Sequence, residues 1–116
     1  MSETKILVTG ALGQLGSELV DALRKEYGNN NVVASDVRNI SQEGLFEVID
    51  VLDRARLDEV VDKYNITQIY HLAAMLSAKG EENPAFAWKL NMDSLINVLE
   101  IAKEKKANIV FIHNSE

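Results

Sequence analysis

Apolar and polar positions follow two different periods along this chain. Short, nearly continuous apolar runs predict strands over residues 5–9, 31–35, 46–49, 68–71 and 108–112, and such runs are typical of parallel strands that are buried on both faces. Between them, apolar residues recur at helical spacing over residues 13–27, after Asp53, and from Pro84 to about Lys105. Asp53 suits an N-cap and Pro84 suits the first helical position. The alternation predicts an α/β domain.

The order of these elements predicts the topology of the sheet. Strand-helix-strand-strand-helix-strand-helix-strand, with right-handed crossovers, gives a Rossmann-like parallel sheet of about five strands in the order 3-2-1-4-5, with helices on both faces. The order reverses between the first and fourth strands. Ligands of such sheets bind beyond the carboxyl ends of the strands at this switch point, so we expect a site there.

Three glycines at a three-residue step follow the first predicted strand, namely Gly10, Gly13 and Gly16. Gly10 permits a backbone conformation that a Cβ would hinder, Gly13 lets backbone N–H groups approach a pyrophosphate, and Gly16 lets the helix pack closely. The helix N-terminus then favours an anion through its N–H groups and its dipole. The spacing differs from the commoner G-x-G-x-x-G, and a turn that binds nothing is the alternative interpretation.

Two acidic residues end the next two predicted strands. Asp36 lies twenty positions after Gly16, where a carboxylate can accept hydrogen bonds from both hydroxyls of an adenosine ribose and would repel a 2′-phosphate. This favours NAD over NADP, although Arg38 could bind that phosphate. Asp50 could reach the amino group of adenine. Each of the two acids could instead serve a turn.

Length and composition exclude several classes of protein. The 116 residues suit a single domain with a proper core. The formal net charge of −6 argues against a nucleic-acid or anionic-membrane partner, so backbone amides must hold any bound phosphate. No cysteine is present, which excludes disulfides and thiolate metal sites. The sequence shows neither a signal peptide nor a membrane span, and we expect a cytoplasmic protein.

Five motifs occur in order along the chain: Gly10-Ala11-Leu12-Gly13-Gln14-Leu15-Gly16, Asp36-Val37-Arg38, Asp50-Val51-Leu52-Asp53, Tyr70-His71-Leu72-Ala73-Ala74 and Trp88-Lys89-Leu90-Asn91-Met92-Asp93-Ser94. Together they resemble the N-terminal part of the extended short-chain dehydrogenase/reductases. Within that superfamily the chain is most similar to the NAD-dependent L-threonine 3-dehydrogenases, which are similar to sugar-nucleotide epimerases. The resemblance extends from Lys5 to about Phe111.

The resemblance implies a role for each residue that matches a family motif. Along the pyrophosphate of NAD the resemblance places Gly10, Gly13, Gln14, Leu15 and Gly16. Around the adenosine ribose it places Asp36, Val37 and Arg38, and beside the adenine it places Asp50 and Val51. Toward the nicotinamide ribose it places Leu72, Ala73 and Ala74. Ser77 falls where the family approaches its amino-acid substrate. Ser115 aligns with the catalytic serine, which helps to orient the reacting hydroxyl. No metal ligands are implied.

The chain departs from the family in its acid/base residues. The family's chemistry uses a tyrosine whose pKa is lowered by a lysine four residues later. Here the three tyrosines, Tyr27, Tyr64 and Tyr70, are followed at that spacing by Asn31, Gln68 and Ala74. Family members are also more than twice this length. We therefore expect one NAD-binding domain, residues 1–116, without turnover of its own; the alternative is a minimal or engineered Rossmann scaffold that binds little or nothing.

The last predicted helix carries two stripes at helical spacing. Ala87, Asn91, Ser94 and Val98 are small enough to pack closely on the sheet, while the second stripe is Trp88, Met92, Ile96 and Leu99. The resemblance places a dimer interface on this helix, so we expect self-association through residues 84–105, unless both stripes are core.

Of the two histidines, His71 suits a structural position at a strand end, and His113 has no second ligand at a spacing suited to a metal.

Overall fold

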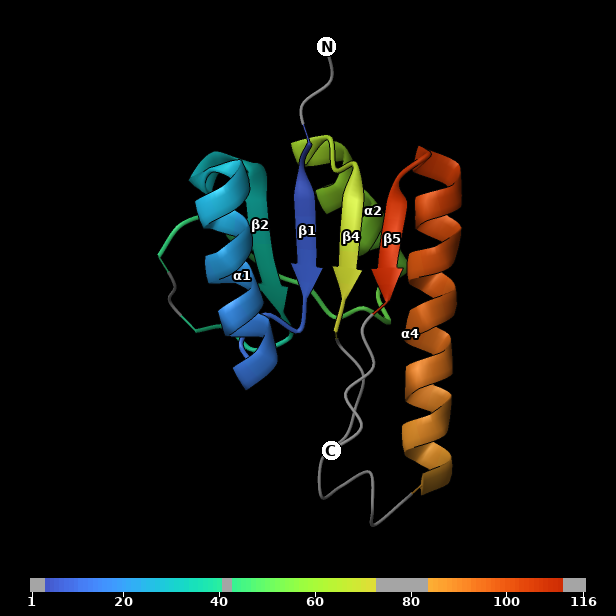
Figure 1. Ribbon diagram of the computed structural model, residues 1–116. Coiled ribbons are helices and arrows are strands. Elements are labelled where there is room, and N and C mark those ends of the chain that lie inside the picture. Colours follow the sequence, from blue (N-terminus) through green and yellow to red (C-terminus); the bar gives the residue numbers. More distant parts are fainter. Residues whose placement is uncertain (1–3, 41–42, 73–83, 112–116) are drawn as a thin grey trace.

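The computed structural model describes residues 4–40, 43–72 and 84–111. Its elements are β1 (Ile6–Thr9), α1 (Gln14–Tyr27), a 3-10 turn η1 (Asn29–Asn31), β2 (Val32–Asp36), β3 (Phe46–Val48), α2 (Arg54–Tyr64), β4 (Gln68–His71), α4 (Pro84–Lys105) and β5 (Asn108–Phe111). Figure 1 shows a single sheet with helices packed along it.

The sheet has the predicted topology. Its five strands lie in the order β3-β2-β1-β4-β5, and all four pairings are parallel. Val8 of β1 pairs with Ala34 of β2 on one side and with Tyr70 of β4 on the other. The Rossmann-like fold and the switch point between β1 and β4 are therefore confirmed.

The ends of β2 and β3 differ from the prediction by one or two residues. Asn31 was predicted to begin a strand, but it lies in η1, where its side-chain amide donates to the backbone carbonyl of Tyr27 over 2.7 Å. β2 therefore begins at Val32 and reaches Asp36. Ile49, the predicted end of β3, lies beyond that strand, although its N–H still donates to the carbonyl of Asp36 over 2.9 Å.

Two apolar clusters cover the two faces of the sheet. On one face, α1 contributes Val20 and Leu23 to a cluster with Ile6, Val8, Val32 and Ala34. On the other, α2 and α4 pack over a larger cluster that contains Leu7, Val33, Ile49, Leu57, Val60, Val61, Ile66, Ile69, Val98, Ile101 and Ala102. The central strand β1 is buried on both faces, which explains its unbroken apolar run.

Among its described side chains, helix α4 buries two residues of one stripe and exposes two residues of the other. Ser94 and Val98 are buried, whereas Ile96 and Leu99 are exposed. The side chains of Ala87, Trp88 and Asn91 lie outside the described part of the chain. Among the residues that the structure describes, no helix is both long enough and apolar enough to cross a membrane.

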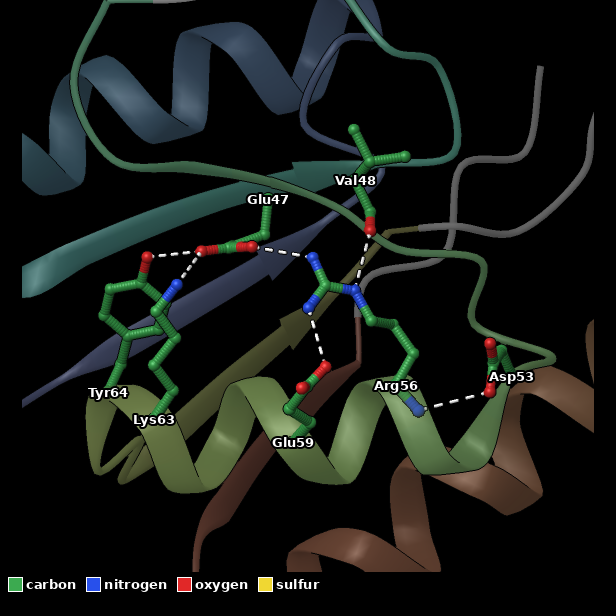
Figure 2. A network of polar contacts seen from close by, with 7 residues as sticks. All are labelled: Glu47, Val48, Asp53, Arg56, Glu59, Lys63 and Tyr64. Carbon is green, nitrogen blue, oxygen red and sulfur yellow. Dashed lines mark hydrogen bonds and ion pairs between the residues drawn. The ribbon is translucent and has the colours of Figure 1, made fainter.

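A polar network fastens the edge strand β3 to α2 (Figure 2). Glu47 accepts from Arg56 over 2.7 Å, from Lys63 over 2.9 Å and from the hydroxyl of Tyr64. At the other end of the helix, Asp53 accepts from the N–H of Arg56 over 3.1 Å, which confirms the predicted N-cap. The network is a structural clamp between a strand and the helix beside it.

Candidate functional site

The turn between β1 and α1 has the backbone that its glycines predict. Gly10 has a φ of +68°, a conformation that L side chains rarely adopt. The next residue, Ala11, donates its N–H to the carbonyl of Ser35 over 2.9 Å, and the N–H of Gly13 points back to the carbonyl of Gly10 at 3.4 Å. The turn is thus bound to the end of β2 on one side and to itself on the other.

Gly16 and Gly13 are glycines for different reasons. A Cβ at Gly16 would lie 2.3 Å from the carbonyl oxygen of Gly10 and 2.9 Å from the Cα of Ala11, so the fold itself requires glycine there. A Cβ at Gly13 would meet its nearest neighbour, the same carbonyl oxygen, at 3.7 Å, which is ordinary contact. The fold leaves room for a side chain at Gly13, so close approach by a ligand is what would require glycine at that position.

The N-terminus of α1 suits an anion. Its N-cap residue, Gly13, forms no side-chain cap, and the first turn carries no acidic residue. Gln14 and Leu15 are exposed beside it. The first N–H groups of a helix have no partner within the helix, and its dipole adds partial positive charge at this end. A phosphate fits this terminus without any lysine or arginine.

Asp36 lies at the carboxyl end of β2 and is 6% exposed. Its Oδ2 accepts from the N–H of Leu12 over 3.0 Å, and its Oδ1 accepts from the N–H of Arg38 over 3.1 Å. The guanidinium of Arg38 adds an ion pair, with Nε 3.1 Å from Oδ1. The carboxylate therefore joins the glycine turn to the segment that follows β2.

The charge of Asp36 follows from these contacts. Burial alone would raise the pKa of this carboxyl, but the hydrogen bonds and the positive charge of Arg38, with the N–H of Leu12, outweigh burial and hold its pKa below the usual range. Asp36 is ionised at neutral pH. Val37, the next residue, is 62% exposed beside it. An ionised carboxylate at this position can accept hydrogen bonds from ribose hydroxyls.

Asp50 serves a turn in the structure. Its carboxylate accepts from the N–H of Leu52 over 3.0 Å, and its carbonyl accepts from the N–H of Asp53 over 2.7 Å. Val51 is half-buried, and its carbonyl accepts from the side chain of Asn97 on α4 over 3.0 Å. The structure therefore shows Asp50 in a turn, and its contact with adenine stays a prediction.

The ends of β1 and β4 are joined by Thr9. Its hydroxyl accepts from the N–H of Leu72 over 3.0 Å and lies 2.9 Å from Nδ1 of His71. His71 is 1% exposed, and burial lowers its pKa to about 4. The imidazole is therefore neutral at pH 7, as suits a structural residue at a strand end. Leu72 is half-buried at the start of the predicted path toward the nicotinamide.

The candidate residues that the structure describes gather at the carboxyl ends of the strands. Gly10, Gly13 and Gly16 follow β1, Asp36, Val37 and Arg38 follow or end β2, Asp50 and Val51 follow β3, and Leu72 follows β4. Four further candidates, Ala73, Ala74, Ser77 and Ser115, lie outside the described residues. Thr9 and the amide of Leu12 were not predicted. A threonine at a strand end gives a weak signal, and a backbone amide gives none.

Tyr64 and Lys63 do not form an acid/base pair. Burial raises the pKa of the Tyr64 phenol, and its hydrogen bond to Glu47 raises it further. The ammonium of Lys63 binds the same carboxylate over 2.9 Å. This tyrosine therefore stays protonated at neutral pH, and the pair belongs to the clamp in Figure 2.

Comparisons with known proteins agree with this geometry. The profile of the NAD dependent epimerase/dehydratase family matches residues 6–115. An uncharacterized epimerase/dehydratase of Staphylococcus saprophyticus is 50% identical over 107 residues, which cover 88% of this chain and 33% of that protein.

Solved structures that are similar in both sequence and fold include two L-threonine dehydrogenases. The X-ray structure of L-threonine dehydrogenase from Clostridium difficile matches with a TM-score of 0.88 at 48% identity, over 96% of this chain and 36% of that chain. The holo form of a GalE-like L-threonine dehydrogenase from Cupriavidus necator matches with a TM-score of 0.85 at 47% identity, over 90% of this chain and 35% of that chain. The chain thus spans about a third of the length of these relatives.

Proposed function

The chain belongs to the NAD dependent epimerase/dehydratase family, and on that premise we propose that it is the NAD-binding module of an oxidoreductase of the L-threonine 3-dehydrogenase kind. It corresponds to the N-terminal, NAD-binding portion of an epimerase/dehydratase or threonine dehydrogenase-like oxidoreductase. The finer assignment, to L-threonine, is supported by the similarity to the two L-threonine dehydrogenases.

One observation carries the proposal of NAD binding. An uncapped helix N-terminus and an ionised, buried carboxylate are held together beyond the carboxyl ends of β1 and β2 by the hydrogen bond from Leu12 to Asp36. The first suits a pyrophosphate, and the second suits a ribose. Gln14 and Leu15 would then lie along the pyrophosphate, with Val37 and Val51 toward the adenosine.

The same carboxylate supports NAD over NADP. Asp36 is ionised and only 6% exposed, so its negative charge, which Arg38 offsets in part, would repel a 2′-phosphate placed beside it. The ribose hydroxyls of NAD would instead donate to it. We propose that NAD is the cofactor.

We propose that this chain holds NAD without turning it over. The proton transfer of the family needs the tyrosine–lysine pair, and none of the three tyrosines here has a lysine four positions later. The chemistry that NAD supplies in such an enzyme is hydride exchange with the β-carbon of L-threonine. Ser77 and Ser115 are the residues of this chain that would approach the substrate and its hydroxyl.

Calorimetric titration with NAD and with NADP at low salt tests the proposal. We expect saturable binding of NAD that exceeds binding of NADP, that is weakened by Asp36→Ala and that is abolished by Gly13→Val. Circular dichroism melts of each variant establish that the sample is folded. Equal binding of both nucleotides, or an Asp36→Ala variant that binds like wild type, contradicts the proposed site.

The second candidate is a Rossmann scaffold or interaction module with little affinity for a nucleotide. It is favoured by one observation, because the carboxylate of Asp36 is already bonded to Arg38 and Leu12. A folded wild-type sample that gives no binding heat with NAD supports this candidate. Saturable binding excludes it.

We also propose self-association through α4. Ile96 and Leu99 are exposed on this helix, and Leu52 is exposed near it. Leu52, Asp93, Ile96 and Asn97 line a shallow depression between the helix and the segment after β3. A second copy of the helix would cover these apolar side chains, which otherwise favour aggregation.

A further inference from the structure

The side chain of Arg38 holds the carboxylate of Asp36 as a fork. Its Nε donates to Oδ1 over 3.1 Å and its Nη2 donates to Oδ2 over 3.3 Å. Two backbone amides complete the set, with Arg38 N–H on Oδ1 and Leu12 N–H on Oδ2. Because a carboxylate offers about four lone-pair positions, each acceptor position of Asp36 has a donor.

These donors differ in how easily they can be replaced. The amide of Leu12 belongs to the turn that Gly10 shapes and that the bond from Ala11 to Ser35 fixes. The side chain of Arg38 is 53% exposed, whereas that of Asp36 is 5% exposed. The guanidinium can therefore turn into solvent, and the carboxylate cannot follow it. An incoming group that needs Asp36 would displace the guanidinium.

The fork offers Asp36 what a ribose diol would offer. It donates two N–H groups, one to each oxygen, and a ribose bound at such a carboxylate donates two adjacent O–H groups. We propose that Arg38 is a specificity-determining residue of the NAD site, because its guanidinium substitutes for the ribose diol on Asp36 and is displaced when the ribose binds. This inference rests on the proposed NAD-binding function.

Displacement acts in opposite directions on the two dinucleotides. For NAD, the ion pair between Arg38 and Asp36 is a competitor, and an ion pair with one half-exposed partner is weak, so its removal tightens binding by about two- to fivefold. For NADP, the 2′-phosphate would pair with the displaced guanidinium, and this ion pair would offset the repulsion between Asp36 and the phosphate. Removing Arg38 therefore weakens NADP binding.

Titration of four proteins with NAD and NADP tests the inference. These are wild type, Arg38→Ala, Arg38→Lys and, as control, Lys105→Ala; Lys105 also pairs with carboxylates, Asp58 at 3.0 Å and Asp62 at 2.9 Å, but lies at the C-terminal end of α4, away from the site. We expect Arg38→Ala to bind NAD more tightly and NADP more weakly. Arg38→Lys should fall between, because an ammonium keeps the charge without the fork. The control should match wild type.

A second titration, with AMP and 2′-deoxy-AMP, tests whether the diol is what competes. The gain from Arg38→Ala should be larger for AMP, because 2′-deoxy-AMP lacks one of the two hydroxyls. Unchanged or weaker NAD binding by Arg38→Ala, or an equal gain for both monophosphates, overturns the inference while NAD binding itself stands. If neither wild type nor Arg38→Ala binds NAD or AMP, the proposed function fails, and this inference fails with it.

Discussion

The backbone N–H of Leu12 donates to Oδ2 of Asp36 over 3.0 Å. Leu12 lies in the turn after β1, and Asp36 ends β2. One hydrogen bond therefore joins the segment proposed to hold the phosphates to the residue proposed to hold the ribose. We therefore expect a change at Asp36 to affect both the shape of the turn and the proposed binding of NAD.

Asp36→Asn separates charge from shape. An asparagine keeps one acceptor oxygen, but its NH2 group cannot accept hydrogen bonds from the N–H groups that face the second oxygen of Asp36. We therefore expect the free energy of unfolding to fall by about 1 kcal/mol. NAD binding should weaken by about tenfold or more, because bonds to a charged acceptor are the stronger ones. Urea unfolding and calorimetric titration measure the two effects. Asp62→Asn, at an exposed carboxylate that pairs with Lys105 away from the site, should change both much less.

Alanine at Gly16 is expected to lower stability strongly, whereas alanine at Gly13 is expected mainly to weaken NAD binding. Gly16→Ala places a Cβ 2.3 Å from the carbonyl oxygen of Gly10, so the free energy of unfolding should fall by about 2 kcal/mol or more. Gly13→Ala meets nothing closer than 3.7 Å and should lose less than about 1 kcal/mol. It should nevertheless weaken NAD binding, since the methyl group would stand where we propose that the pyrophosphate approaches. Full NAD affinity in a folded Gly13→Ala protein contradicts this role for Gly13.

The fold could be predicted because its signals are local. The strands of a parallel sheet are continuous apolar runs, as in Ile6–Thr9, and helix starts carry their own markers, as at Asp53 and Pro84. The errors lie at strand ends. Asn31 was predicted to begin β2, but its side chain caps the carbonyl of Tyr27, and that choice depends on how the chain leaves α1 rather than on the residue type.

The location of the candidate site could be predicted from the sequence, but most of the contacts within it could not. Gly10, Gly16 and Asp36 could be identified by residue type and spacing, and the structure brings them together at the carboxyl ends of the strands. The fork from Arg38 to Asp36 and the bond from Leu12 were not predictable, because side-chain direction and backbone amides leave no pattern in a sequence. The sequence indicated Arg38 as a ligand for a 2′-phosphate or as a neighbour of the adenosine ribose, not as a partner of Asp36.

His71 predicts a loss of stability in mild acid. Burial lowers its pKa to about 4 from 6.5, so between these pH values the unfolded chain binds a proton that the folded chain does not. The contribution of neutral His71 to the free energy of unfolding is therefore fully present above pH 6.5. The free energy of unfolding then falls as the pH decreases to about 4, by up to about 3 kcal/mol. Urea unfolding across this range measures the slope, and NMR titration of the imidazole measures the pKa. An imidazole that titrates near 6.5 in the folded protein contradicts the prediction.

Glu47 acts in a lower range of pH. Burial would raise the pKa of this carboxyl, but its bonds from Tyr64, Lys63 and Arg56 outweigh burial and lower the pKa to about 2 from 4.5. The clamp is complete above pH 4.5 and is lost as the pH falls toward 2. Since Lys63 and Arg56 are partly exposed, we expect a loss of about 2 kcal/mol.

Glu47→Gln should lower stability at pH 7 and flatten the slope below pH 4.5. Tyr64→Phe, which removes only a neutral donor, should keep most of that slope.

The exposed apolar residues of α4 predict that a single charge prevents self-association. Ile96 is 46% exposed on this helix, and Ile96→Glu would place a carboxylate inside the proposed interface, where burying an unpaired charge is costly. We expect sedimentation velocity to show dimers of wild type and monomers of the variant at the same concentration. Ile40→Glu is the matched control, because Ile40 is similarly exposed, at 50%, but follows β2. Monomeric wild type, or equal dissociation of both variants, argues against an interface on α4.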